Sequence, residues 1–301
     1  MMKTNFYKEI RENNFKTTLL FVLFFLLIAG MGWLFGFYIG DHLISTIIVL
    51  IIGVIYAFIA YFAGASMVLS MMGAKLATKP DHTHYINSVE GLAIAAGIPN
   101  PKCYVIQDSA LNAFATGRDP KHAAVTVTTG LMAKLNKQEL EGVIAHEIAH
   151  IKNFDIRTML IASVLVGVVT LISDFMLRMT IFGSHRRGSK DSGGGQVVII
   201  IIAILLAILA PFIAQLIKLA VSRKREFVAD AEGAKLTRYP EGLASALEKI
   251  SADPDPLVDR ANKATAHLFI STPFRKKKSF MTKMFATHPP IAERIAKLRG
   301  M

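Results

Sequence analysis

Two histidines and a glutamate stand close together in the sequence, at a spacing suited to metal-assisted hydrolysis. From Asn136 the chain reads NKQELEGVIAHEIAHIKNFD, with His146 and His150 four residues apart and Glu147 beside the first. On a helix the two imidazoles project from one face and can bind one metal ion, while Glu147 is placed to act as a base toward water at that metal. Zinc suits such ligands and leaves a fourth position for water. About 0.01 chance occurrences of this motif are expected in a chain of this composition.

The segment that carries these residues has the signature of a helix. Asn136 is a good N-cap residue, and Glu139 follows three residues later, as in a capping box. Apolar residues then recur at helical spacing, at Leu140, Val143, Ile144, Ile148 and Ile151. The alternative is a surface helix that carries two histidines by chance, so a third ligand is needed to decide.

A second segment, SRKREFVADAEGAKL, offers that ligand. Glu226 and Asp230 are four residues apart, so a helix places them on one face. Glu226 is the natural carboxylate ligand, and Asp230 is placed to accept a hydrogen bond from a ligating histidine and fix its tautomer. Asp155 is a weaker candidate for the same supporting role and is equally plausible as an ordinary helix-terminal residue. For an isolated acidic pair of this kind, a solvated helix face is the alternative.

Four long apolar runs frame these segments. The chain has 301 residues, of which 52% are hydrophobic and 19% charged, and its mean hydropathy is +0.44. About 20 apolar residues span a bilayer as a helix, which predicts four transmembrane helices. They are expected at about 17–36, 43–62, 159–182 and 197–221.

The basic residues predict how these helices are oriented. The formal net charge is +12, and 30 of the 34 Lys and Arg residues lie in 1–16, between the second and third runs, or from Lys218 to the C-terminus. The positive-inside bias therefore places both termini and the central segment in the cytoplasm. The charge then reflects topology rather than nucleic-acid binding, and the bilayer is the expected partner.

This topology predicts the domain organisation. Residues 1–62 form an N-terminal segment and a transmembrane hairpin, and 159–221 form a second hairpin. Residues 63–158 and 222–301 then combine into one cytoplasmic domain, because the second hairpin returns the chain to the same membrane face. His150 and Glu226 can meet there, close to the bilayer surface. The lone Cys103 excludes an intramolecular disulfide framework.

The sequence resembles a known family. HEIAH followed by SRKREFVAD is similar to the HtpX family of membrane-bound zinc metalloproteases, which are related to the type I CAAX prenyl proteases, and the resemblance extends over nearly the whole chain. It implies a mostly α polytopic membrane protein whose cytoplasmic domain is a gluzincin-like α+β zinc protease with a small β-sheet. It also implies one Zn²⁺ per chain, polypeptide substrates, a bacterial-type cytoplasmic (inner) membrane and a stress-response role in quality control of misfolded membrane proteins. The oligomeric state is not predicted.

A small sheet is also expected from local patterns. Residues 103–107 read as a strand, and 112–117 and 122–130 flank a four-residue turn, which predicts a β-hairpin. The resemblance implies that substrate backbone adds to the strand containing Asn112, Ala113, Phe114 and Ala115. Upstream, Asp81 is expected to cap a helix that ends near Ala95.

The C-terminal THPPIAERI holds two candidates for stabilising the transition state, His288 and Arg294. For Arg294 an ordinary ion pair is an equally good alternative, because a catalytic role requires geometry that a sequence pattern does not give. Two other functions stay open. A CAAX-type prenyl-peptide protease would need a large intramembrane chamber, for which four spans are few. A non-enzymatic metal-containing membrane scaffold would have no use for Glu147.

Overall fold

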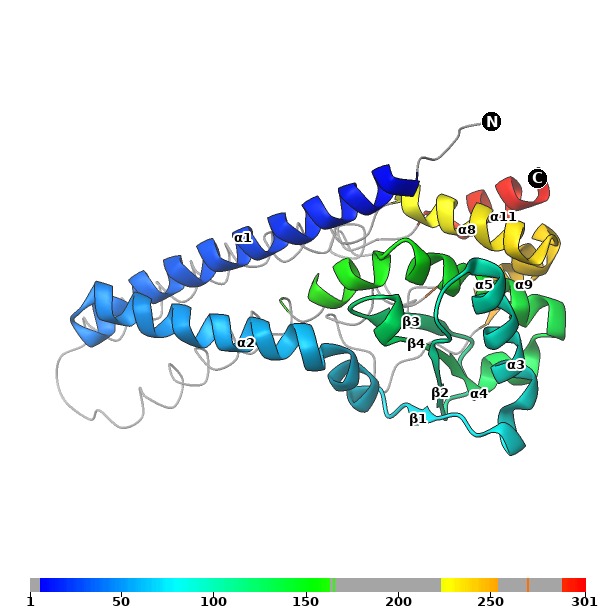
Figure 1. The fold of residues 1–301 in the computed structure, drawn as a ribbon, viewed down its shortest axis with the longest axis horizontal. Coiled ribbons are helices and arrows are strands. Elements are labelled where there is room, and N and C mark those ends of the chain that lie inside the picture. Colours follow the sequence, from blue (N-terminus) through cyan, green and yellow to red (C-terminus); the bar gives the residue numbers. More distant parts are fainter. Residues whose placement is uncertain (1–5, 163–164, 166–222, 254–269, 271–288) are drawn as a thin grey trace.

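The structure, a computed structural model, describes residues 6–162, 165, 223–253, 270 and 289–301. A long helical hairpin extends from a mixed domain that holds the sheet and the remaining helices (Figure 1). The expected fourth apolar run, and nearly all of the third, lie outside the described residues.

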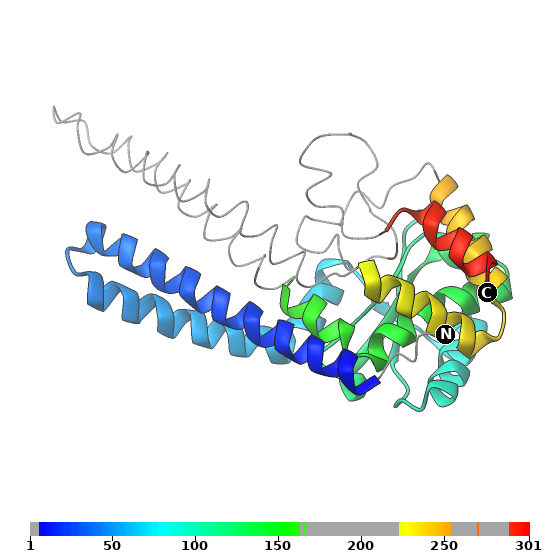
Figure 2. The same ribbon diagram turned by 90° about the horizontal axis from the view of Figure 1, so that it is seen from above.

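The hairpin consists of α1 (Phe6–Ile39) and α2 (His42–Met71), which pack together near their connecting turn and diverge toward the mixed domain (Figures 1 and 2). The described residues contain two helical stretches long and apolar enough to cross a membrane, Asn14–Trp33 and His42–Met71. Asp41 caps α2, because its Oδ1 accepts hydrogen bonds from the main-chain N–H groups of Leu43 and Ile44. The chain therefore reverses direction within the very short turn between α1 and α2.

The helix α2 is longer than its apolar run predicts. It continues to Met71 because no proline interrupts it, and it ends just before Gly73, which has a φ of 64°. Its last turns leave the hairpin and pack on the sheet, through Val68 and Leu69. The hairpin and the domain are thus joined by one continuous helix.

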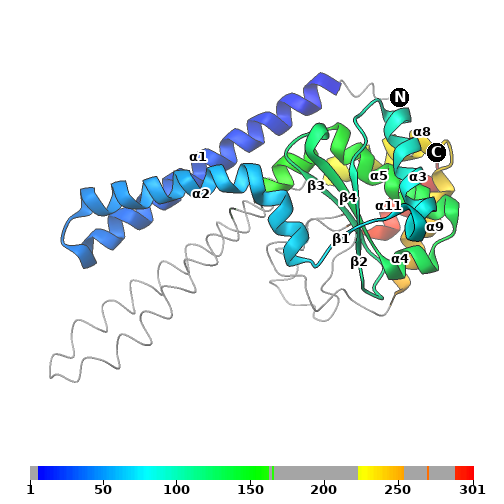
Figure 3. The same ribbon diagram turned by 60° about the horizontal axis from the view of Figure 1, so that its bottom comes forward.

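The domain contains a four-stranded sheet in the order β1-β2-β4-β3 (Figure 3). The strands are β1 (Lys75–Leu76), β2 (Lys102–Ile106), β3 (Ala113–Gly117) and β4 (Ala123–Thr128). The expected hairpin of the last two is confirmed, since β3 and β4 pair antiparallel, whereas β2 and β4 are parallel. The expected four-residue turn is longer, because the 3₁₀ turn η1 (Pro120–His122) delays β4 until Ala123.

The two faces of the sheet face different cores, as the alternation of side chains along a strand requires. Val105, Ala115 and Val125 lie in the main core, and Ile106, Phe114 and Ala124 lie in the core shared with the end of α2. The other helices of the domain are α3 (Lys79–Ala96), α4 (Thr129–Lys134), α5 (Lys137–Lys152), α8 (Arg223–Thr237), α9 (Pro240–Ala252) and α11 (Ile291–Arg299).

The start of α3 corrects one expectation. Its N-cap is Thr78 rather than Asp81, and Asp81 lies in the first turn, where its Oδ2 accepts a hydrogen bond from the Thr78 hydroxyl. The helix ends at Ala96, one residue later than expected, and Gly97 follows with a φ of 71°.

Candidate metal centre

The helix α5 begins as its sequence predicts. Asn136 and Glu139 form a capping box, in which each side chain accepts a hydrogen bond from the other residue's main-chain N–H. The apolar residues of α5 lie in the main core. His146 and His150 are buried as well, and their Nε2 atoms lie 3.1 Å apart.

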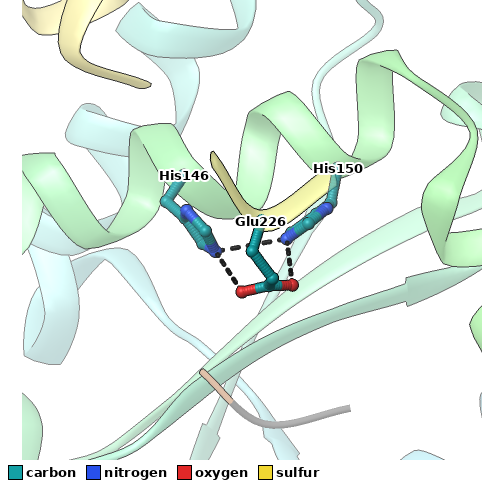
Figure 4. A group of neighbouring side chains, drawn as sticks. All are labelled: His146, His150 and Glu226. Carbon is teal, nitrogen blue, oxygen red and sulfur yellow. Dashed lines mark hydrogen bonds and ion pairs between the residues drawn. The ribbon is translucent and has the colours of Figure 1, made fainter. Parts of the chain in front are cut away.

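The third expected ligand arrives on α8. Glu226 Oε2 lies 3.8 Å from Nε2 of His146, and its Oε1 lies 3.5 Å from Nε2 of His150. One ligand atom from each residue lies within 4.8 Å of the others, and Figure 4 shows the three side chains converging from α5 and α8. Gly233 permits this approach, because a Cβ there would lie 3.0 Å from the main-chain nitrogen of His146.

The Nδ1 atom of each histidine contacts an aspartate, and each of these aspartates pairs with an arginine. His146 Nδ1 lies 2.9 Å from Asp230, which binds Arg294 through two hydrogen bonds. His150 Nδ1 lies 2.8 Å from Asp155, whose other oxygen lies 3.0 Å from Arg225 Nη1. The six side chains are buried, listed in chain order as His146, His150, Asp155, Arg225, Asp230 and Arg294.

These contacts define a site that fits a divalent cation. A carboxylate at Nδ1 requires the proton on that nitrogen, so the Nε2 atoms of both neutral rings turn their lone pairs toward each other and toward Glu226. Such an arrangement is repulsive unless a proton or a metal ion lies between the atoms. Among the described residues, four buried carboxyl groups (Glu147, Asp155, Glu226 and Asp230) and two buried guanidinium groups surround the histidines, an excess of acidic groups that a cation would offset. Two neutral imidazoles and a carboxylate are a ligand set that zinc prefers.

The pKa values of the two histidines move in opposite directions. Burial and the Arg294 charge lower the pKa of His146 to about 4, which keeps its ring neutral. Burial also opposes protonation of His150, but the hydrogen bond to Asp155 and the charge of Glu226 outweigh it and raise its pKa to about 9. A metal ion must therefore take the place of a proton at His150.

Glu147 lies between the ligands in sequence and is buried beside them. Burial raises the pKa of its carboxyl group to about 7, and the main-chain N–H of Ala115 donates a hydrogen bond to it. The carboxyl group is thus tied to the edge strand β3, which is itself completely buried.

The structure brings most of the expected site residues together. Asp155 contacts His150 and Asp230 contacts His146, the two candidate metal ligands on α5. Arg294 binds Asp230 and also lies 3.4 Å from Glu226 Oε2 and from His146 Nε2, so it contacts the proposed ligand atoms directly. His288 lies outside the described residues. Arg225 was not expected at the site, and its adjacency to Glu226 gave no signal, because its partner Asp155 lies 70 residues away in the sequence.

Comparisons with known proteins agree with this geometry. Residues 81–301 match the model of peptidase family M48. A protein named Protease HtpX homolog from Dictyoglomus turgidum is 44% identical over 306 residues, covering 100% of this chain and 96% of that protein. One of the same name from Streptococcus agalactiae serotype III is 44% identical over 297 residues, covering 98% of this chain and 99% of that protein.

A solved structure shares the fold. The crystal structure of S. mikatae Ste24p matches with a TM-score of 0.51 and 21% identity over 93% of this chain. This chain spans 62% of that longer one.

Proposed function

Because the chain belongs to peptidase family M48 and is a membrane zinc metalloprotease, we propose that His146, His150 and Glu226 hold its catalytic zinc. The observation that carries this proposal is the convergence of their three ligand atoms within 4.8 Å. Asp230 and Asp155 orient the two imidazoles, and such partners raise the basicity of the ligand and fix its tautomer.

Glu147 is the proposed catalytic base. Bound zinc supplies a Lewis acid for the scissile carbonyl and acidifies water in the site. Glu147 accepts a proton from the attacking water and then delivers it to the leaving amine. Burial raises the pKa of this carboxyl group, which favours the protonated form that delivers the proton to the amine.

The edge strand β3 is the proposed binding site for the substrate backbone. Among the described strands, β3 pairs only with β4, and it lies against α5, which carries Glu147. Its residues are buried, so a substrate strand must displace the groups that cover this edge. Strand addition at such an edge gives affinity through main-chain groups and makes few demands on side chains. This mode suits misfolded membrane proteins, which we propose as the substrates in a quality-control and stress-response role.

Proteolysis of an unstructured protein by the purified full-length chain in detergent tests the assignments. Glu147→Gln is expected to keep its zinc and lose cleavage, whereas Glu226→Ala is expected to lose both. Equal cleavage by wild type and Glu147→Gln would rule out the base. Unchanged zinc content in Glu226→Ala would remove the third ligand.

The membrane arrangement is a further part of the proposal. Four spans enter a bacterial-type inner membrane, with both termini and the metal centre in the cytoplasm, as the positive-inside bias supports. In a Cys103→Ser background, a cysteine at Ser192 should react with a membrane-impermeant maleimide in intact cells. One at the exposed Lys137 should react only after permeabilisation. The reverse pattern would overturn this orientation.

A further inference from the structure

The edge strand β3 presents its outer main-chain groups at alternate residues. Asn112 directs its carbonyl toward β4, where it accepts a hydrogen bond from Thr128 N at 3.1 Å. Because successive residues of a strand point these groups to opposite sides, Ala113 and Ala115 direct theirs to the outer edge. These are the groups that an added substrate strand would use.

Both outer groups of Ala113 are already bound within the chain. Its N–H donates to Asn112 Oδ1 at 3.1 Å, and its carbonyl accepts a hydrogen bond from the N–H of Ile270 at 3.1 Å. A substrate strand that reached Ala113 would find neither its donor nor its acceptor available.

Ile270 is held in this position at its side chain and its main chain. Its side chain is 2% exposed and belongs to the main hydrophobic core of the domain. Its carbonyl lies 3.4 Å from Arg294 Nη1, on the same guanidinium that binds Asp230. Displacing Ile270 would expose an apolar side chain and disturb the contacts behind the metal ligands.

Ala115 differs from Ala113 in its partner. Its main-chain N–H faces the carboxyl group of Glu147, the proposed base, so Ala115 lies beside the reacting bond and offers its outer carbonyl to a substrate N–H. It lies two positions after Ala113, about 6.8 Å along β3.

We propose that Ile270 is a specificity-determining residue that ends the substrate-binding edge of β3 at Ala115. Substrate backbone then pairs with β3 from Ala115 onward in one direction only, toward Gly117. On the other side of the reacting bond the substrate leaves the sheet. This inference rests on the proposed function and narrows the expected Asn112–Ala115 binding strand to its last residue.

A scan of N-methylated peptides tests it with the full-length, zinc-loaded protein in detergent. One peptide that wild type cleaves is prepared with each main-chain N–H methylated in turn. Methylation at a pairing residue should lower kcat/KM about 2- to 13-fold, the value of one hydrogen bond. The sensitive residues should extend from the scissile bond on one side only. Equal sensitivity on both sides would overturn the proposal.

A pair of variants separates Ile270 from other causes of such a pattern. Ile270→Pro removes the N–H that occupies Ala113, and a new sensitive position should appear across the scissile bond. Ile270→Val keeps the N–H and should match wild type. Zinc content and thermal midpoint identify the variants that fold. A folded Ile270→Pro with the wild-type pattern would contradict the proposal, and if it does not fold, the wild-type scan decides alone.

The same experiment distinguishes a failure of this inference from a failure of the proposed protease function. Absence of cleavage by wild type, or equal cleavage by Glu147→Gln, would reject the proposed function. Cleavage that depends on Glu147, with sensitivity on both sides of the scissile bond, would reject only the role of Ile270.

Discussion

Arg294 binds Asp230 through two hydrogen bonds, from Nε to Oδ2 at 2.9 Å and from Nη2 to Oδ1 at 2.6 Å. The same Oδ1 lies 2.9 Å from Nδ1 of His146. The guanidinium therefore fixes the carboxylate that fixes the imidazole. The sequence left a catalytic role and an ordinary ion pair open for Arg294. The ion pair with Asp230 is present, and we propose that it positions the ligands.

Replacement of Arg294 should therefore weaken zinc binding. Arg294→Ala is expected to lower zinc affinity about 10- to 100-fold, because partners of this kind orient the ligands they support. Arg294→Lys keeps the charge but not the two-pronged geometry, so it should lie between alanine and wild type. Competition with a chromophoric chelator measures the affinity. Wild-type zinc affinity with a large loss of kcat would instead place the guanidinium on the reacting atoms.

The second series of contacts runs from His150 through Asp155 to Arg225, and it predicts energetic coupling between Asp155 and Arg225. Arg225→Met removes a cation from a buried carboxylate and should cost about 3–5 kcal/mol of stability. Asp155→Asn removes the negative charge, so the double variant should lose less than the sum of the single losses. A coupling energy of about 0.5–3 kcal/mol is expected from unfolding in detergent. Additive losses would mean that the two groups do not stabilise each other.

The sequence predicted α5 well because its signals are local. The capping box of Asn136 and Glu139, the apolar spacing and the four-residue separation of the histidines all lie within one helix. The pairing of Glu226 with this helix followed from topology, since both segments were expected on one membrane face. Local chemistry and chain direction were enough to predict that His146, His150 and Glu226, the proposed metal ligands, would lie close together.

The supporting contacts could not be predicted in the same way, because they depend on tertiary geometry. Asp155 reaches His150 only because the chain turns at Phe154, which has a φ of 59°, an unusual value for a residue with a bulky side chain. Ile270 pairs with Ala113 across 157 residues of chain. Neither contact has a periodicity or a motif that marks it in the sequence.

The capping box of α5 predicts a dependence of stability on pH. The Glu139 carboxylate is buried, which would raise its pKa, but hydrogen bonds from Lys249, Ser245 and Asn136 outweigh this and lower the pKa below 4.5. The folded state therefore binds this proton less tightly than the unfolded state. The resulting stability is present above about pH 4.5 and is lost as the pH falls through the folded pKa.

Glu139→Gln should show this loss directly. At pH 7 its thermal midpoint should lie below that of wild type, and the difference should shrink as the pH falls below 4.5. Thermal unfolding in detergent across this range measures both proteins under the same conditions. A difference that stays constant with pH would show that Glu139 contributes only as a neutral hydrogen-bond partner.

The approach of α8 to α5 depends on the absence of a side chain at Gly233. A Cβ there would lie 3.0 Å from His146 N and 3.3 Å from its Cα, and main-chain atoms cannot rotate away. Gly233→Ala should therefore shift α8, cost about 1–3 kcal/mol and weaken zinc binding, because α8 carries Glu226 and Asp230. Gly91→Ala is the matched control, since a Cβ there meets no atom within 4 Å and α3 should gain about 0.5–1 kcal/mol. The gain in helix propensity is common to both variants, so the difference between them measures the contact with His146. Equal stability and zinc affinity in the two variants would show that the helices can separate without disturbing the site.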